Sequence, residues 1–538
     1  MSGLDSHRIY VSTIGDFLLA AADRCGDRAA LIFPERELSY SELAEHAYLR
    51  ARSMLGLGVR PGDHVGILMA NCPEFMELLL GCHLIGAVAV PMNARYKASE
   101  LAYVVENADL KLLVTSDLIS EYANFGELLA EAFPELAMSD PKALDLALAP
   151  LLRNVVMLGA APAGFVSEQD FISHAERVEQ ADVDAARVKV RVEQPAIMMY
   201  TSGTTANPKG CPLSHGLLVR NGVNMNRERY FLTETDVFWA PLPMFHMAAI
   251  LPFLACIDAG AAMSSMTHVE AGTALRMMER DRVSVAFPSF PTVTNELINH
   301  PSFPDTDLSA LRRINNVAPE EMLRRFQSAF PQAVQTGAYG LTEAGGVIAF
   351  NHPEESLDVR LHTCGVPFPG IDVRITDPET LEEVATTERG EIWIRGYCVF
   401  DGYYKSPEKN AESFHNGWFR SGDLGSVTET GAVCYHGRIK DMLKVGGENV
   451  AALEIESHLA KHPSVLLAQV VGRPDDRLQE VPVAFIELTP GTSATEADLI
   501  AHCQGQMASF KVPRAIFFVT EWPMSSTKVQ KFKLLDLL

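Results

Sequence analysis

The chain has 538 residues, of which 47% are hydrophobic and 21% are charged. This balance is typical of a folded globular protein and argues against a largely disordered chain, and the length predicts at least two domains. The formal net charge of −23 argues against nucleic acid or an anionic membrane as the main partner, because either would require a basic surface.

The cysteines and the N-terminal residues indicate a cytoplasmic protein. Nine cysteines are scattered without a Cys-x-x-Cys pair, as is typical of reduced thiols. The first residues do not form a basic segment followed by an apolar one, so no signal peptide is expected. No uninterrupted apolar run reaches the ~20 residues of a membrane span, and we expect no transmembrane segment.

Short apolar segments alternate with helical segments in the first part of the chain. The predicted strands are 29–33, 65–69, 88–90 and 111–115. Helices are predicted at 41–56, 73–85 and 98–107. This alternation predicts a parallel sheet covered by helices. From 118 to 193 there is no clean period, and we expect mostly helix.

Further along the chain the same pattern returns and then changes. Strands are predicted at 237–242 and 283–287, and helices at 272–282 and 320–330. Short alternating stretches from 365 to 394 predict a small β-rich subdomain. The roughly 100 residues after Asp441 have the size of a small domain. They are predicted to form an α+β unit with helices at 452–461 and 496–507 and strands at 466–472 and 481–488.

A run rich in glycine and hydroxyl residues follows an apolar, strand-like segment. It extends from Tyr200 to Gly210 and reads Tyr-Thr-Ser-Gly-Thr-Thr-Ala-Asn-Pro-Lys-Gly. Glycines allow backbone N–H groups to approach an anion, hydroxyls donate hydrogen bonds without bulk, and Lys209 adds a positive charge. The run therefore predicts a polyphosphate-binding loop. It does not match G-x-x-x-x-G-K-[ST], which argues against a P-loop enzyme.

This run resembles the signature loop of the adenylate-forming superfamily, which includes acyl-CoA synthetases, peptide-synthetase adenylation domains and luciferases. Four more segments match family motifs in the family's order, namely 339–343, 417–425, 437–441 and 528–531. The resemblance implies an α/β fold with a large N-terminal domain, residues 1–439, built of two parallel-type sheets plus a distorted β-barrel. It also implies a small mobile α+β C-terminal domain, residues 440–538.

The resemblance further implies a site for ATP and Mg²⁺. The residues implied around the β- and γ-phosphates are Thr201, Ser202, Gly203, Thr204, Thr205 and Lys209. Tyr339, flanked by Ala338 and Gly340, is expected to stack on adenine. Thr342 is expected at the α-phosphate, and Glu343 is expected to bind Mg²⁺, which favours carboxylate oxygen.

The remaining roles concern the ribose and the reacting groups. The resemblance implies that Asp423 accepts both ribose hydroxyls, which suits an acceptor-only carboxylate, and that Arg438 binds the ribose or a phosphate. Lys528 is implied to bridge the α-phosphate and the substrate carboxylate during adenylation. A surface ion pair for Arg438 and a solvated tail position for Lys528 are the alternatives that the residues alone leave open.

A second half-reaction is implied for coenzyme A. In the family the small domain rotates about a residue that corresponds to Lys440 and exposes a second face, here with Gly446 and Gly447. Glycines there would let a pantetheine arm pass close to the backbone. His246 resembles a histidine near the acyl and thiol path, although a buried structural histidine would give the same pattern.

Four features depart from the family pattern, and one of them is that the stretch before Met322-Leu323 looks shortened. Ala206 stands where glycine is usual, Asn316-Val317 replaces Gly-Gly, and Lys528 lacks the glycine that normally precedes it. If the Ala206 position needs a positive φ, the cost is about 1 kcal/mol. The segment around Asn316 normally lines the adenine and acyl pockets, so the pocket residues of the family are not transferred to it.

The expected function is that of an acyl-CoA synthetase, which converts a carboxylate and ATP to acyl-AMP and pyrophosphate and then exchanges AMP for CoA. A fatty acid is favoured because the candidate pocket segments 247–254, 286–293 and 345–349 are apolar or small. The alternatives are an aryl-acid CoA ligase, an acyl-AMP ligase that loads a carrier protein, and a catalytically weakened binding or regulatory homologue. The expected partners are small molecules, and a homodimer is left open.

Overall fold

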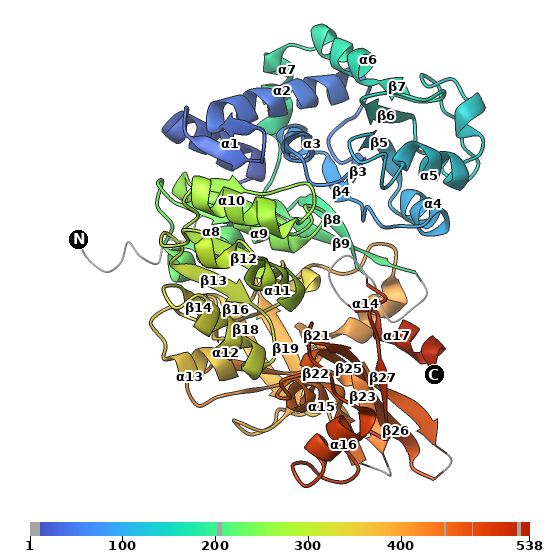
Figure 1. Cartoon of the computed structure of the whole chain (residues 1–538). Helices are drawn as coiled ribbons and strands as arrows, with labels where there is room; N and C mark the ends of the chain where they lie inside the picture. Colours follow the sequence, from blue (N-terminus) through green and yellow to red (C-terminus); the bar gives the residue numbers. More distant parts are fainter. Residues whose placement is uncertain (1–10, 202–206, 446–447, 476, 525–528) are drawn as a thin grey trace.

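Two large sheets covered by helices form the N-terminal part of the chain (Figure 1). The computed structural model describes residues 11–201, 207–445, 448–475, 477–524 and 529–538. Within these residues each large sheet has seven strands, and smaller sheets follow toward the C-terminus. The α/β class expected from the sequence is confirmed.

The first large sheet has the strand order β7-β6-β5-β3-β4-β8-β9, with β9 antiparallel to β8 and the other neighbours parallel. Its strands are β3 (His64–Leu68), β4 (Val88–Pro91), β5 (Leu110–Ser116), β6 (Asn154–Leu158), β7 (Val166–Ser167), β8 (Pro195–Thr201) and β9 (Lys209–Ser214). Helices α3 (Pro73–Ile85) and α4 (Ala98–Asn107) have the bounds that the sequence predicts. Most residues of β3 to β5 are buried, as expected for parallel strands covered on both faces.

The second large sheet has the order β14-β13-β12-β10-β11-β1-β2, with β2 antiparallel at one edge. Its strands are β1 (Ala29–Ile32), β2 (Glu37–Ser39), β10 (Val237–Trp239), β11 (Ala262–Ser264), β12 (Val285–Ser289), β13 (Arg313–Asn316) and β14 (Val334–Thr336). Helices α10 (Ala271–Arg280), α11 (Pro291–Asn299), α12 (Glu320–Ala329) and α13 (Leu357–His362) lie around it. Helices α1 (Ile14–Cys25) and α2 (Tyr40–Gly56) pack against each other and against α3.

The prediction of mostly helix from 118 to 193 is wrong in part. Helices α5 (Phe125–Ala132), α6 (Glu168–Ser173) and α7 (Gln180–Arg187) do form, but β6 and β7 extend the first sheet in the same region. All five residues of β6 are buried. A short strand that is buried on both faces has no alternation of polar and apolar residues, so periodicity does not reveal it.

Two helices lie between the large sheets (Figure 1). Helix α8 (His215–Met225) packs on β8 and β9, α9 (Met247–Ala259) packs on β11 and β12, and the two helices contact each other. Both are buried along most of their length, and Asn221 of α8 is a fully buried polar residue. Helix α8 therefore brings a polar side chain into the interior.

Antiparallel strands form the predicted β-rich region after the second large sheet. A three-stranded sheet contains β15 (Ala338–Tyr339), β16 (Ala349–Phe350) and β17 (Val366–Pro367) among the described residues. A five-stranded sheet there contains β18 (Ile371–Thr376), β19 (Gly390–Gly396), β20 (Phe414–His415), β21 (Trp418–Val427) and β22 (Val433–Arg438), with α14 (Pro407–Ser413) preceding β20. This region is longer than the predicted stretch of 365–394.

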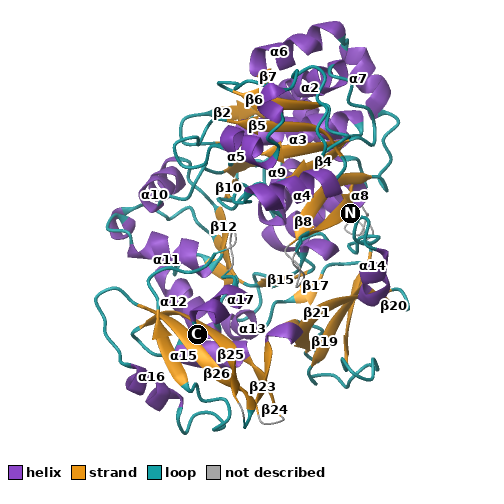
Figure 2. Cartoon of the chain, turned by 90° about the vertical axis from the view of Figure 1, so that its right-hand side faces the viewer, coloured by secondary structure: helices purple, strands orange, loops and turns teal. Residues whose placement is uncertain are grey.

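The C-terminal part has its own sheet and helices (Figure 2). It contains β23 (Met442–Val445), β24 (Glu448–Ala451), β25 (Val465–Asp475), β26 (Gln479–Leu488) and β27 (Ala515–Phe518), with α15 (Ala452–Leu459), α16 (Glu496–Cys503) and α17 (Lys531–Leu534). Helices α15 and α16 end before their predicted limits. A 3-10 turn, Ile439–Asp441, connects β22 to β23 and so joins two different sheets.

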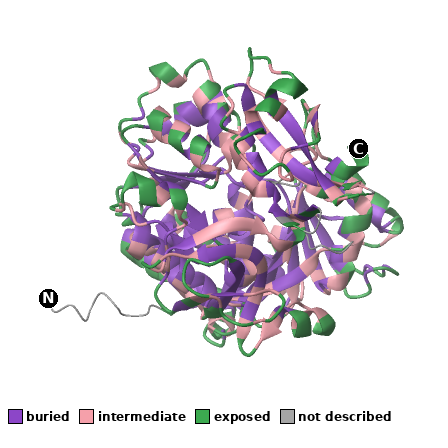
Figure 3. Ribbon diagram, turned by 90° about the horizontal axis from the view of Figure 1, so that it is seen from below, coloured by how far each residue is buried: buried purple, intermediate pink, exposed green. Residues whose placement is uncertain are grey.

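The interior follows the two-sheet arrangement. In the view from below (Figure 3), buried residues concentrate in the strands and exposed residues in the outer helices and loops. One large cluster of buried apolar side chains includes residues of α1, α2, α3, α8 and α9 and of strands in both large sheets. The C-terminal part has separate clusters. The C-terminal part therefore has a core of its own.

Candidate active site

Three residues expected at the ribose and adenine come together where β15, β21 and β22 meet. Asp423 and Arg438 face each other in the β21–β22 pair, and Arg438 Nε lies 2.8 Å from Asp423 Oδ1. The hydroxyl of Tyr339 donates to Asp423 Oδ2 at 2.8 Å. Asp423 is only 2% exposed. The antiparallel register therefore places Arg438 beside a buried carboxylate, and Tyr339 of β15 reaches the other oxygen of the same carboxylate.

Burial and charge set the protonation of both partners. Burial, together with the negative charge of Asp423, raises the pKa of Tyr339 well above its usual value, so the phenol remains a donor. Burial disfavours the charged form of Arg438, but Asp423 and other nearby groups more than compensate and raise its pKa. Arg438 therefore stays positively charged beside Asp423.

The ring of Tyr339 packs against a second tyrosine. Its centroid lies 5.8 Å from that of Tyr435, with an angle of 27° between the ring planes. Tyr435 precedes Arg438 on β22 and was not singled out in the sequence. Adenine stacking on Tyr339 stays a prediction.

Thr342 and Glu343 lie in a 3-10 turn, Thr342–Ala344, that follows β15. Gly340 permits this turn, because a Cβ at Gly340 would lie 1.8 Å from the carbonyl oxygen of Gly346. The Glu343 carbonyl accepts a hydrogen bond from Phe400 N at 3.0 Å. The Glu343 carboxylate accepts one from the Tyr403 hydroxyl at 2.8 Å. The segment after β19 thus binds both the backbone carbonyl and the side-chain carboxylate of Glu343.

Asn221 supports this turn from the other side. Its Nδ2 lies 3.4, 3.0 and 3.1 Å from the carbonyl oxygens of Ala344, Gly345 and Val347. Its Oδ1 accepts a hydrogen bond from the Tyr397 hydroxyl at 2.6 Å. Sequence reasoning missed Asn221 and Tyr403. Two asparagines, Asn221 and Asn224, lie among the apolar residues of the segment 215–225, and this pattern is a signal that could have indicated Asn221.

Of the residues predicted to bind the β- and γ-phosphates, the structure describes Thr201 and Lys209. Thr201 and Lys209 are paired across β8 and β9. Burial and the nearby Lys409 lower the pKa of Lys209, and the charges of Glu343 and Glu412 oppose this effect. Lys209 is therefore within electrostatic reach of Glu343. The remaining predicted loop residues, Ser202, Gly203, Thr204 and Thr205, and the neighbouring Ala206 lie outside the described residues.

Other predicted residues lie elsewhere or are outside the described residues. His246 is the N-terminal cap residue of α9, with its ring 4.8 Å from that of Phe245. Lys440 is exposed in the connection between β22 and β23. Ala338 is buried in β15 beside Tyr339. The predicted residues Gly446, Gly447 and Lys528 lie outside the described residues.

The departure at Asn316 has a structural role. Asn316 is fully buried at the end of β13. It accepts a hydrogen bond from the Thr294 hydroxyl at 2.5 Å, and its amide donates to Gln335 Oε1 at 2.9 Å. This polar chain joins α11 to β13 and β14, and the adjacent Val317 is 44% exposed. The asparagine side chain is therefore turned into the interior.

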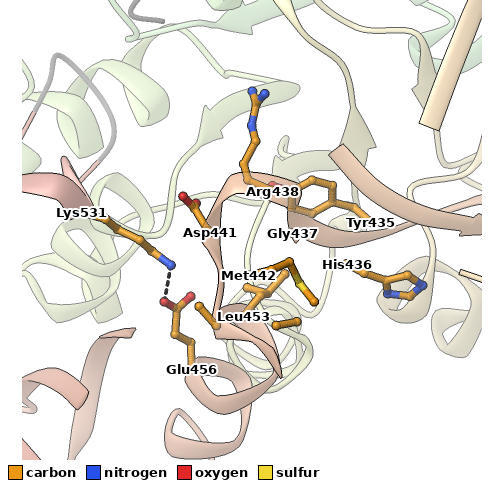
Figure 4. A pocket seen from close by; sticks show the side chains of 11 residues that line it. Tyr435, His436, Gly437, Arg438, Asp441, Met442, Leu453, Glu456 and Lys531 are labelled. Atoms are coloured by element: carbon orange, nitrogen blue, oxygen red, sulfur yellow. Dashed lines mark hydrogen bonds and ion pairs between the residues drawn. The ribbon is translucent and has the colours of Figure 1, made fainter. Parts of the chain in front are cut away.

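A small cavity of about 160 Å³ lies between β22 and the C-terminal part (Figure 4). Asp441, Glu456 and Lys531 are among its lining residues, and Lys531 Nζ lies 2.5 Å from Glu456 Oε1. The guanidinium of Arg438 points away from this ion pair in Figure 4. The cavity thus lies beside the 439–441 connection.

Two further properties concern metals and membranes. Among the described residues, no group of three or more His, Cys, Asp or Glu side chains could hold a metal ion. A Mg²⁺ ion that binds mainly through nucleotide phosphates needs only one or two carboxylates, and the half-buried Glu343 fits that requirement. In the same part of the chain, no helix combines the length and apolar character needed to span a membrane.

Comparison with known proteins shows the family. The model of the AMP-binding enzymes matches residues 18–404, and the model of their C-terminal domain matches residues 454–529. A putative acyl-CoA synthetase of Bacillus subtilis, YngI, is 34% identical over 97% of this chain and 96% of its own length. The rat mitochondrial medium-chain acyl-CoA ligase ACSF2 is 31% identical over 98% of this chain and 88% of its own length.

Structural similarity extends over the whole molecule. The crystal structure of the anthranilate CoA ligase AuaEII, in complex with anthranoyl-AMP, matches with a TM-score of 0.84 and 26% identity, covering 100% of this chain and 99% of its own. The chain therefore belongs to the AMP-binding, adenylate-forming enzyme family. Within that family it is an acid–thiol ligase of the acyl-CoA synthetase type.

Proposed function

We propose that the protein activates a hydrophobic carboxylate, a fatty acid, through acyl-AMP and transfers the acyl group to coenzyme A, with ATP and Mg²⁺. The observation that carries this proposal is the buried Tyr339–Asp423–Arg438 cluster beside the Thr342–Glu343 turn. This cluster lies in a chain that resembles acyl-CoA ligases over nearly its whole length.

Asp423 is the residue that would bind the ribose of the nucleotide. An ionised carboxylate can accept about four hydrogen bonds, and Tyr339 and Arg438 occupy one position on each oxygen of Asp423. The ribose hydroxyls would donate to this carboxylate. Arg438 would hold the carboxylate in place and add a positive charge near the phosphates.

The phosphate end rests on Thr342, Glu343, Lys209 and Lys528. When bound, Mg²⁺ would neutralise phosphate charge, and Glu343 would hold it through a carboxylate oxygen. Lys209 would bind the β- and γ-phosphates together with Thr201, Ser202, Gly203, Thr204 and Thr205. Lys528 would stabilise the charge that develops at the α-phosphate as the carboxylate oxygen attacks and pyrophosphate leaves.

The second half-reaction needs a different surface of the C-terminal part. We divide the chain into residues 1–439 and 440–538, which the position of the 439–441 turn between two sheets supports. Rotation about Lys440 would bring Gly446 and Gly447 to the site, where they would flank the pantetheine arm. The thiol would then attack the acyl carbon and release AMP, with His246 beside the acyl path.

The fatty substrate is supported by the named medium-chain ligases among the relatives. An aryl acid is the second candidate, because the AuaEII structure, titled as an anthranilate CoA ligase, matches the chain over its whole length. We also propose a cytoplasmic location. All nine cysteines lie in the described part of the chain and none forms a disulfide, as expected in a reducing compartment.

The experiment is carboxylate-dependent pyrophosphate exchange over a panel of fatty and aryl acids, followed by product analysis with CoA. The proposal expects exchange with medium- or long-chain fatty acids and acyl-CoA as product. Exchange with aryl acids alone would show that the substrate is an aryl acid and not a fatty acid. Adenylate formation without a CoA thioester would indicate a ligase that loads a carrier protein. No exchange with any acid would indicate a binding homologue.

A further inference from the structure

The Glu343 turn has a fixed backbone, so the remaining freedom of this residue is in its side chain. Asn221 binds the carbonyls of Ala344, Gly345 and Val347, and Phe400 N binds the carbonyl of Glu343. A half-buried glutamate on a fixed backbone still has three rotatable side-chain bonds. The contacts of the Glu343 carboxylate therefore determine where its negative charge lies.

Among the described residues, two cations, Lys209 and Arg438, lie within electrostatic reach of this carboxylate. Burial lowers the pKa of Lys209 and Glu343 opposes that effect. Burial likewise disfavours charged Arg438, and Glu343 is among the groups that raise its pKa. A carboxylate in such a field is drawn toward the cations. An ion pair with either one would reduce the negative charge that Glu343 can offer to a metal ion.

Tyr403 binds the carboxylate through a hydroxyl group that carries no charge. Its hydroxyl donates to Glu343 Oε1 at 2.8 Å, and the ordinary pKa of a phenol is about 10. The group is therefore a neutral donor at any pH at which the enzyme works. It occupies one carboxylate oxygen and leaves the charge of Glu343 in place.

The position of Tyr403 is itself fixed. Its backbone N–H donates to Asn410 Oδ1 at 2.7 Å, and Asn410 Nδ2 donates to its carbonyl at 3.0 Å. Its ring packs edge-on against Phe400, with centroids 4.9 Å apart. The hydroxyl is therefore presented to Glu343 by a rigid support, and removing that one oxygen leaves the support intact.

We propose that Tyr403 is a positioning residue whose hydroxyl holds the Glu343 carboxylate in the orientation that receives the Mg²⁺ ion bound to ATP. This proposal rests on the proposed role of Glu343. The contact joins the segment after β19 to the turn after β15, which are 60 residues apart in the sequence. The proposal assigns a function to Tyr403, and a variant of the neighbouring Tyr404 serves as the control.

The test is ATP binding without any carboxylic acid, measured by calorimetry over a series of Mg²⁺ concentrations. Tyr403→Phe should raise the Mg²⁺ concentration for half-maximal ATP binding about tenfold, as expected for the loss of one hydrogen bond to a charged group. Tyr404→Phe removes a hydroxyl that donates to Asp109 at 2.7 Å and should leave this concentration unchanged.

A double-variant cycle shows whether Tyr403 acts through Glu343. Glu343→Gln should raise the Mg²⁺ requirement, and adding Tyr403→Phe to it should cause no further rise. If Glu343→Gln has the effect and Tyr403→Phe has none, or if the two effects add, the positioning role is wrong. If Glu343→Gln has no effect, both the metal assignment and the positioning role fail, whereas pyrophosphate exchange still tests the proposed reaction separately.

Discussion

The carboxylate of Asp423 is bound by two side chains that are themselves expected to contact the nucleotide. Arg438 lies on one oxygen and Tyr339 on the other, both at 2.8 Å. The sequence identified these residues through three separate motifs, and the structure brings them into one cluster. The Asp423–Arg438 contact follows from strand register, whereas the contact with Tyr339 joins residues that are far apart in the chain.

Asp423→Asn should raise the ATP concentration needed for half-maximal pyrophosphate exchange at least tenfold. Hydrogen bonds to a charged acceptor contribute roughly 1.5–3 kcal/mol each, and asparagine removes the charge and one acceptor. Asp372→Asn is the control, because it breaks an exposed ion pair with Arg395 in the same antiparallel sheet. An equal rise in both variants would indicate a general effect on the sheet and remove Asp423 from the nucleotide site.

At the scale of elements, α8 supports the site through Asn221. Asn221→Ala would leave three carbonyl groups, of Ala344, Gly345 and Val347, without this donor in the interior, at a cost of about 1–3 kcal/mol for each group that stays unsatisfied. We expect a lower melting temperature and weaker ATP binding. Among the contacts of the described residues, Asn224→Ala loses one side-chain hydrogen bond, to the Tyr397 hydroxyl, and it should have a smaller effect on both. Equal ATP affinity in the two variants would contradict the supporting role.

Helices α3 and α8 also bring together two buried histidines, His83 and His215, with ring centroids 5.3 Å apart. Burial and the nearby His215 lower the pKa of His83 well below its usual value, and burial lowers the pKa of His215 to about 4. The unfolded chain binds these protons near pH 6.5, so the histidine contribution to stability is present above that pH. It is lost as the pH falls from about 6.5 to 4.

The drop in melting temperature from pH 7 to pH 5 should be smaller in His83→Leu than in the unmodified protein. One histidine that stays neutral when folded changes the unfolding free energy by up to about 1.4 kcal/mol per pH unit. His268→Leu is a control, since His268 is exposed. The same drop in all three proteins would show that His83 does not couple folding to pH.

The elements that could be predicted are those whose ends or period are marked by residues within the element or next to it in the sequence. Helix α3 begins at Pro73 and is followed by Gly86 in a left-handed conformation, and both residues mark its ends in the sequence. The buried strand β6 has no such period and was missed. Asn221 and Tyr403 were missed for a different reason. Their contacts reach residues 123 and 60 positions away, respectively, and a single sequence contains no record of such pairs.

At the scale of the whole molecule, the 439–441 connection joins two parts with separate cores. Proline fixes φ near −65° and restricts the preceding residue, so Lys440→Pro should block a rotation through this position. We expect this variant to retain pyrophosphate exchange and lose thioester synthesis, and Lys440→Ala to retain both. Near-normal thioester synthesis by the proline variant would contradict the hinge.

The central claim is that the acyl group passes through acyl-AMP to CoA, and isotope transfer from the carboxylate tests it most directly. With both carboxylate oxygens of a fatty acid labelled with ¹⁸O, attack on the α-phosphorus makes a new oxygen–phosphorus bond, and thiol attack on the acyl carbon then leaves that oxygen on AMP. The account predicts AMP with one ¹⁸O, unlabelled pyrophosphate and one ¹⁸O in the acyl-CoA. Unlabelled AMP, or ADP with labelled phosphate, would contradict it.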